Sequence, residues 1–557
     1  MRRIATEPAA ASRAQEPGRA RVLTGELRRR WFEFGVAACA LAVGSFLIVQ
    51  LMAWPPHEDE TLALFIGRKS FGGLLDTVLD QRGGAPLHFI FAWIVAHTGG
   101  GLVGLRLVSA IFATASVPVI ALLGARVAGR ASGLAATVIC SASWMLLFHG
   151  IYGRMYSLFL FTSALSFLAL LHATERRTRA AWALWALAVL LCVAAHPYGA
   201  IVLASQGVYV VLTRVPFRVT VPAFAAVAIV GIPFWRTDLV LAGRFDVGAV
   251  HGSSSLNSLS SIASYLKGVA GDFTAGYTFV ITIVLLLALA GFLSLVRRRP
   301  KGALLVAAVI GTPFLALVVA KLGSAAPMSR HLIFVLPFFA VLVAEGLIRV
   351  SSLGRRLAPA IAIVGVLALV PAEIAWGIHR TPELYRGEPG AHVTARAAAA
   401  AWIAARSEPD DVLFGYEPLF AQAFDDSSRV SKTVVPRADA KLALASLESA
   451  RKPLGHGFWV FDASDTTNAL RRQTIPLLSP QPTSDFEVAS FGPFLIVRTV
   501  APTGCVARYL KLARRVETLG AQIDTMPDYD LGDADINLGT VLQAERRLDR
   551  QKNPPAC

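Results

Sequence analysis

Apolar residues in this chain gather in blocks of roughly 17–25 residues, the length at which a helix crosses a hydrocarbon core of about 30 Å. Short polar loops separate the blocks, so each block predicts one membrane-spanning helix. The pattern predicts eleven spanning helices, over residues 33–54, 102–124, 131–149, 155–173, 180–195, 199–213, 219–236, 276–296, 302–320, 331–349 and 356–377.

The first long loop, 55–101, holds two apolar stretches that do not fit this pattern. Residues 86–98 are too few to span the bilayer comfortably. Most apolar residues of 61–79 fall on one face of a helix, as in a helix that lies in the plane of the interface. We therefore expect two juxtamembrane helices within 61–98, the second interfacial or re-entrant. A second long loop, 238–275, is rich in Ser and Gly and is either a mobile lid or a passive connector.

The composition agrees with a membrane protein. Hydrophobic residues make up 55% of the 557 residues, the mean hydropathy is +0.56, and charged residues make up 16%, where a soluble domain carries roughly 25%. The net charge of +16 does not indicate nucleic-acid binding, because the basic residues lie in short clusters between the apolar blocks.

These basic clusters predict the topology. Five alternate loops, at 124–131, 174–180, 214–218, 297–301 and 349–356, hold fourteen Lys and Arg, whereas the short loops between them hold three. Because basic loops stay in the cytoplasm, we expect a multi-pass plasma-membrane protein with a cytoplasmic N-terminus. An odd number of spans then places the C-terminal region outside the cell.

The chain divides into three predicted parts: a disordered cytoplasmic tail over 1–30, a transmembrane domain over 31–379 and an extracytoplasmic α/β domain over 380–557. No Gly-rich phosphate loop or nucleophile elbow occurs in the last part, so we expect it to serve in recognition or as a scaffold. Its predicted helices are 391–406, 438–450, 505–521 and 535–551, and its predicted strands include 457–462 and 494–499.

Cys505 and Cys557 lie in the extracytoplasmic part, whereas Cys39, Cys140 and Cys192 lie inside apolar blocks. Since the outer compartment is oxidising, we expect Cys505 and Cys557 to form a disulfide. The alternative is two free thiols.

The first candidate for chemistry is the sequence His57-Glu58-Asp59-Glu60, which directly follows the first spanning helix. A carboxylate half-buried at the membrane surface could act as a general base toward an acceptor hydroxyl. The alternative is that Asp59 or Glu58 caps a helix that begins at Thr61.

Other polar residues gather in the loops that the topology places on the same outer side. Arginine binds phosphate through its planar fork of donors, so arginines near an acidic cluster suit an anionic, hydroxyl-rich substrate. The alternative for each arginine is that it reaches the lipid headgroups. The residues of this group are Arg154, Tyr156, His196, Tyr198, Arg330 and His331.

The order and loop placement of several stretches resemble the GT-C glycosyltransferases. The resemblance is to the family 39-like group, which includes protein O-mannosyltransferases and the aminoarabinose transferases of lipid A. The stretches are HEDETLALFIGRKSFGGLL, GAPLHFIFAWI, LRLVSAIFATASVPVIALLGARVAGR, GRMYSLF, HPYG and SRHLIFVLPFFAVLVAEGL, between residues 57 and 346.

This resemblance implies roles for individual residues. Asp59 and Glu60 match the family's acidic pair, with Asp59 as the catalytic base. Arg330 with His331, and Arg154, would bind the donor phosphate, while His57, Tyr156, His196 and Tyr198 would line the substrate site. The chain departs from the family at Tyr152, where an acid often stands. A second loop carboxylate is therefore missing, and we expect no required metal and no other cofactor.

The resemblance implies transfer of a sugar from a polyprenyl-phosphate donor to an acceptor hydroxyl on a protein, lipid or polysaccharide. One displacement at the sugar C1 would invert its configuration. Two other interpretations are a transporter or lipid flippase, and a non-catalytic assembly protein. Charges avoid the predicted helix centres, which argues against a proton-coupled carrier.

Overall fold

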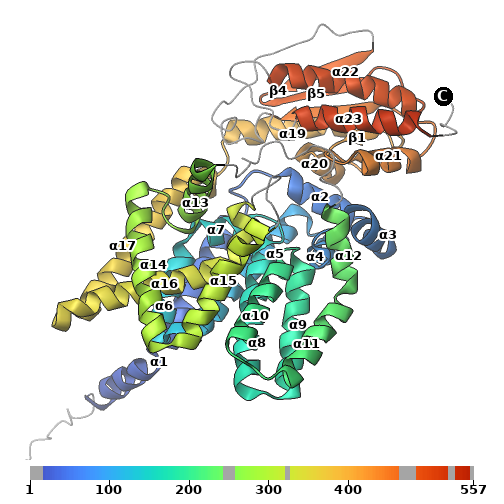
Figure 1. Cartoon of the computed structure of the whole chain (residues 1–557). Helices are drawn as coiled ribbons and strands as arrows, with labels where there is room; N and C mark the ends of the chain where they lie inside the picture. The colour runs from blue at the N-terminus through green and yellow to red at the C-terminus, as the bar shows by residue number, and fades with distance from the viewer. Residues whose placement is uncertain (1–16, 243–257, 320–326, 463–484, 525–533, 552–557) are drawn as a thin grey trace, which may run out of the picture.

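The computed structural model describes residues 17–242, 258–319, 327–462, 485–524 and 534–551 (Figure 1). A bundle of helices makes up most of the chain, and a five-stranded sheet with its own helices lies beyond one end of the bundle (Figure 1). The predicted Ser/Gly-rich stretch at 243–257 falls outside the described residues.

Each predicted span corresponds to an apolar helix or to a pair of helices joined at a bend. Six described helices are long and apolar enough to cross a membrane alone, or eight spans if two pairs bent by 55° and 56° count as one each. Three others (α9, α10 and α15) are shorter. The helices are α1 (Pro17–Val49), α5 (Gly101–Ala128), α6 (Arg130–Ala142) with α7 (Trp144–Ile151), α8 (Tyr156–Arg176), α9 (Arg179–Ala195), α10 (Gly199–Leu212), α11 (Phe217–Val230) with α12 (Ile232–Ala242), α14 (Thr278–Arg298), α15 (Pro300–Val319), α16 (Leu336–Ser351) and α17 (Ala358–Arg380).

Burial follows the position of each helix in the bundle. Large apolar side chains are exposed along α1, α14 and α17, as expected for surfaces that face lipid. By contrast, α16 and the 3-10 turn η3 (Ser329–Val335) before it are mostly buried, as is α8. The chain is therefore a polytopic helical membrane protein.

The N-terminal prediction was wrong for part of its range. Helix α1 begins at Pro17 and is interrupted by non-helical backbone at Arg30. Residues 17–29 contain Arg, Leu and Glu, which favour a helix, so they extend α1 instead of forming a disordered tail. Residues 1–16 lie outside the described part of the chain.

The loop after α1 forms four short elements where we expected two. These are α2 (Glu58–Gly67), α3 (Phe71–Asp76), the π-helix η1 (Thr77–Arg82) and α4 (Pro86–His97). Residues 60–67 of α2 are all buried, which differs from the one-sided burial of an interfacial helix. The reason is that α2 packs on α4 and is covered on its other side by the C-terminal domain.

The C-terminal domain is a three-layer α/β/α unit. Its strands are β1 (Val412–Phe414), β2 (Val434–Val435), β3 (Gly457–Asp462), β4 (Phe486–Phe491) and β5 (Phe494–Thr499), in the order β2-β1-β3-β5-β4. Strands β2, β1 and β3 are parallel, and β3, β5 and β4 are antiparallel. Its main helices are α19 (Gly390–Arg406), α20 (Pro418–Asp426), α21 (Ala440–Ser449), α22 (Val506–Asp524) and α23 (Ala534–Asp549).

The two faces of the sheet belong to different cores. Alternate strand residues such as Val412, Trp459 and Val497 pack with α21, α22 and α23. Residues of the opposite face, such as Phe458 and Ile496, pack in one cluster with α19, α20, α2 and α4. The juxtamembrane helices are therefore part of the hydrophobic core of the C-terminal domain.

Candidate active site

The acidic cluster occupies the first turn of α2, and His57 is the residue that caps this helix. The Nδ1 atom of His57 accepts a hydrogen bond from the backbone N–H of Asp59 at 3.2 Å, and the Glu60 carboxylate accepts one from the His57 N–H at 3.1 Å. This reciprocal arrangement is a capping box. The predicted alternative, a cap by Asp59 or Glu58, was therefore wrong.

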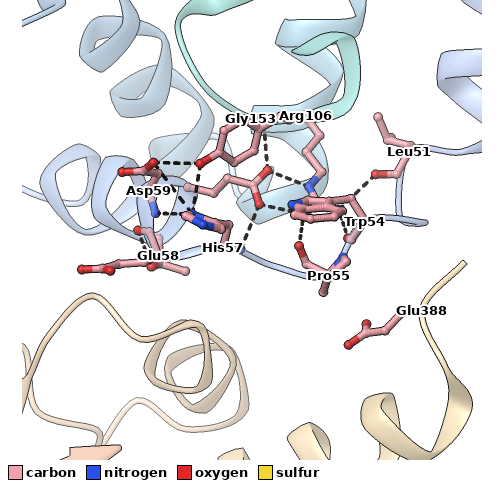
Figure 2. Close-up of polar contacts among 12 residues, drawn as sticks. Leu51, Trp54, Pro55, His57, Glu58, Asp59, Arg106, Gly153 and Glu388 are labelled. Carbon is pink, nitrogen blue, oxygen red and sulfur yellow. Dashed lines mark hydrogen bonds and ion pairs between the residues drawn. The ribbon is translucent and has the colours of Figure 1, made fainter. Parts of the chain in front are cut away.

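Glu60 is held in a fully buried ion pair with Arg106 of α5. The guanidinium binds both carboxylate oxygens, at 2.8 and 2.7 Å, and both side chains have no exposed surface. The backbone N–H of Gly153 donates to the same carboxylate at 2.7 Å (Figure 2). Arg106 also donates to the carbonyl oxygens of Leu51, Trp54 and Pro55. Glu60 thus anchors the loop and has no surface open to substrate, which differs from the catalytic acidic pair with Asp59 that the resemblance implied.

Asp59 points away from this pair and keeps 28% of its side chain exposed. Its Oδ2 atom accepts a hydrogen bond from the Tyr152 hydroxyl at 2.8 Å and forms an ion pair with Arg154. Among the described residues, Oδ1 has no hydrogen-bond partner. The carboxylate is therefore oriented through one oxygen and open at the other (Figure 2).

Burial sets the protonation of the groups around Asp59. It raises the pKa of Tyr152 well above its ordinary value, so the phenol stays a donor. Burial also lowers the pKa of His57, and the nearby Arg154 and Arg330 lower it further, against the opposing effect of Glu58 and Glu60. Since His57 Nδ1 accepts from a backbone N–H, the neutral ring carries its proton on Nε2. Burial lowers the pKa of Arg154 to about 10, so its guanidinium remains charged at neutral pH.

A cavity of about 730 Å³ opens beside His57. It lies between the end of α1, α7, the start of η3, the end of α17 and helix α13 (Leu259–Phe273). Its walls combine indole rings with charged groups, a combination that suits a ligand with both apolar and polar parts. The lining includes Trp54, His57, Trp144, Lys267, Asp272, Arg330, Trp376 and Arg380.

Arg330 and His57 are the two predicted site residues among those that line this cavity. Arg330 lies over the Tyr156 ring, with 5.7 Å between its guanidinium carbon and the ring centre. Its Nε atom is buried, and within the described chain its guanidinium has no hydrogen bond or ion pair. A charged guanidinium without a protein partner is a ready site for an anionic group.

The other predicted substrate residues form the support behind Arg330. Tyr156 and His196 are buried, and their rings lie 5.6 Å apart. His331 lies 5.7 Å from His196 and 5.1 Å from Tyr198. Tyr156, His196 and Tyr198 were predicted to line the substrate site, and His331 to bind the donor phosphate. In the structure, the rings of these residues contact one another. The structure therefore brings the predicted residues together: Arg330 lines the cavity, and the rings of Tyr156, His196, Tyr198 and His331 pack behind it.

The sequence analysis did not single out Arg106, Asp272 and Arg380 as residues of the site. Arg106 lies within an apolar block, where a charge signals a functional or paired group. Asp272 accepts a hydrogen bond from the Ser329 hydroxyl at 2.5 Å and lies 3.6 Å from Arg380. Burial raises the pKa of Asp272, against the effects of Ser329 and Arg380. No sequence signal connects these segments, since they are far apart in the chain.

Two further predictions concern metal ions and the disulfide. Within the described ranges, no group of three or more His, Cys, Asp and Glu side chains could hold a metal ion. Cys505 is disulfide-bonded, while its predicted partner Cys557 lies outside the described residues.

Comparisons with known proteins identify the fold. No protein-family model matches this chain, and no curated protein matches it. ArnT from Cupriavidus metallidurans in the apo state aligns with a TM-score of 0.52 and 16% sequence identity, covering 85% of this chain and 98% of ArnT. The oligosaccharyltransferase AglB from Archaeoglobus fulgidus, solved with an inhibitory peptide and a dolichol-phosphate, aligns with a TM-score of 0.50 and 12% identity, covering 80% of this chain and 71% of AglB. The chain thus has the GT-C fold.

Proposed function

We propose that this protein is a membrane glycosyltransferase that moves a sugar from a polyprenyl-phosphate donor to an acceptor hydroxyl. Its fold is shared with ArnT and with AglB, and one AglB structure holds a dolichol-phosphate, which is a lipid of this type. The observation that carries the proposal is that two groups with unused hydrogen-bonding atoms both lie near His57. These are the open Oδ1 of Asp59 and the unpaired guanidinium of Arg330.

In the proposed reaction, Asp59 accepts the proton of the acceptor hydroxyl as that oxygen attacks C1 of the sugar. The bond between C1 and the phosphate oxygen breaks on the opposite side, so the configuration at C1 inverts. The leaving lipid phosphate keeps the electron pair of that bond. Arg330 stabilises its negative charge, which is electrostatic stabilisation of the transition state.

Arg154 takes a different part from the donor-phosphate role that we expected. Its ion pair with Asp59 and the hydrogen bond from Tyr152 fix one carboxylate oxygen, so we propose that Arg154 orients the base. Because each of the two neighbouring carboxylates, Asp59 and Glu60, already has an arginine as its charge partner, we also propose that the reaction needs no metal.

We propose that the active site faces the outside of the cell. The basic loops lie at the ends of the spans opposite to the loops that carry Asp59, Arg154 and Arg330, and basic loops favour the cytoplasm. The isoprenoid tail of the donor would then lie in the bilayer beside the cavity.

The first test uses the purified protein in detergent, polyprenyl-phosphate sugars and a panel of hydroxyl acceptors. We expect Asp59→Asn to lower kcat by about 10²–10⁴-fold, the usual contribution of a general base. Arg330→Ala should lower it by about 10²–10³-fold, as for the loss of one electrostatic stabiliser. Equal turnover by the wild type and both variants would refute the site. A transporter or flippase would give no glycosyl product with any donor and acceptor.

A further inference from the structure

The first turn of α2 is held from its outer side by the C-terminal domain. Glu58, the neighbour of Asp59, forms a two-point ion pair with Arg437. The distances are 3.1 Å from Nε to Oε1 and 2.7 Å from Nη2 to Oε2. The side chains of Arg437 and Glu58 are 9% and 20% exposed, so solvent weakens this pair less than a surface pair.

Two strand ends of the sheet supply these contacts. Arg437 follows β2 by two residues, and the hydroxyl of Thr61 donates to the carbonyl oxygen of Tyr416, which follows β1 by two residues. Strands β1 and β2 are parallel, so both contacts come from the same carboxyl edge. In open α/β sheets this edge commonly binds a ligand, but here it binds the loop that carries Asp59.

The backbone between these strand ends is shaped to admit Arg437. Gly415 directly follows β1 and has a φ of +88°, a conformation that a residue with a side chain rarely adopts. A Cβ atom at this position would lie 3.0 Å from the Arg437 Nε. Glycine therefore leaves the space in which the guanidinium reaches Glu58.

We propose that Arg437 is a positioning residue for catalysis, which acts through Glu58 to fix the orientation of the Asp59 carboxylate. This inference rests on the proposed function when turnover is measured, but it can also be tested without turnover, by hydrogen exchange. We expect a large effect on turnover, because displacing a catalytic group by about 1 Å can lower the reaction rate roughly 10²-fold. The C-terminal domain, to which the sequence analysis assigned no chemistry, thereby completes the site.

Of the two residues in this ion pair, Glu58 is the better one to replace, and the variant is Glu58→Gln. Arg437 also lies close to the buried Glu517 of α22. The pKa of this carboxyl is about 8, because burial raises the pKa more than the nearby Arg437 and the hydrogen bond with Asn537 lower it. Replacing Arg437 would therefore disturb the domain core as well as the link to α2. Glu58→Gln weakens the link and leaves Arg437 next to Glu517.

The matched control is Asp425→Asn. It breaks a second ion pair between α2 and the C-terminal domain, from Arg68 to Asp425 at 3.0 Å. That pair lies at the far end of α2 from Asp59 and is more exposed. Both variants thus remove one carboxylate from an α2 interface, but only Glu58→Gln acts next to the base.

The experiment measures kcat and the donor KM of the full-length protein with a polyprenyl-phosphate sugar. We expect Glu58→Gln to lower kcat by about 10–100-fold and to leave KM within about twofold, since Arg330 is untouched. Arg437→Lys, which keeps the charge but loses the fork, should retain more kcat than Arg437→Gln. Asp425→Asn should keep the wild-type kcat. A wild-type kcat for Glu58→Gln would overturn the proposal.

Hydrogen exchange tests the same link without any transfer reaction. The amides of Asp59, Glu60 and Thr61 are hydrogen-bonded to His57 in the capped turn. Glu58→Gln should speed their exchange by about tenfold or more if Arg437 holds this turn, whereas Asp425→Asn should not. If the wild type transfers no sugar, the proposed function fails, and unchanged exchange in Glu58→Gln would show separately that Arg437 does not position the turn.

Discussion

Asp59 and Glu60 are adjacent in the chain, but helix α2 turns their carboxylates toward different neighbours. Glu60 faces the bundle and meets Arg106 and the Gly153 amide, with no surface left exposed. Asp59 faces outward and keeps one oxygen open. Two acids of equal intrinsic chemistry thus become an anchor and a candidate base through their surroundings alone.

The anchor role predicts a large loss of stability when Arg106 is replaced. Arg106→Met would leave the Glu60 carboxylate buried without its charge partner, a change that typically costs about 3–5 kcal/mol. We expect thermal unfolding in detergent to show a clearly lower Tm for this variant.

Arg126→Met is the control for Arg106→Met. Arg126 forms its ion pair with Glu175 at 3.4 Å on an exposed surface, where such pairs contribute about 0–1 kcal/mol. A similar Tm for Arg106→Met and Arg126→Met would contradict the anchor role of Glu60.

At the scale of elements, α2 depends on a close approach to α4. A Cβ atom on Gly67 would lie 2.6 Å from the backbone carbonyl oxygen of Ala92, and this backbone cannot move aside without shifting α4. Gly67→Ala should therefore destabilise the protein by about 1–3 kcal/mol, as overpacking does, and lower kcat through displacement of Asp59.

Gly72→Ala, in the neighbouring helix α3, is the matched substitution, because its Cβ would meet nothing within 4 Å. Thermal unfolding and turnover of the two variants should be measured side by side. If Gly67→Ala behaves like Gly72→Ala in both assays, the packing of α2 on α4 does not position the site.

The elements also show what the sequence could and could not predict. Apolar block length predicted the bundle helices, because membrane thickness acts on each block locally. The start of α2 was missed because its cap depends on a reciprocal bond between His57 and Glu60. The burial of α2 was missed because α20, which packs on it, lies more than 350 residues later in the sequence.

The same division applies to the candidate site. The sequence identified His57, Asp59, Arg154 and Arg330 because polar residues at membrane depth are conspicuous. It could not distinguish residues that face the cavity from those behind them, and it gave no hint that Asp272 and Arg380 share a wall. Asp272 and Arg380 come together because α13 and α17 both pack on α7.

At the scale of the whole molecule, the proposed orientation predicts which surfaces a membrane-impermeant thiol reagent can reach. Ser449 is exposed on the C-terminal domain, and Lys301 is exposed at the start of α15, in the basic segment 297–301. We expect Ser449→Cys to react in intact cells and Lys301→Cys to react only after the membrane is permeabilised. Wild-type chain labelled in parallel gives the background from its own cysteines, and the reverse pattern would invert the topology.

The shared core of α2, α4 and the sheet also constrains the order in which the protein matures. Helix α2 leaves the ribosome early, but α20, which packs on it, is translated hundreds of residues later. Until then, its apolar side chains are covered by the neighbouring helices α4 and α5 and by the lipid surface. We therefore expect a prematurely terminated chain to insert into the membrane without the contacts that hold the first turn of α2, and to lack the proposed transferase activity.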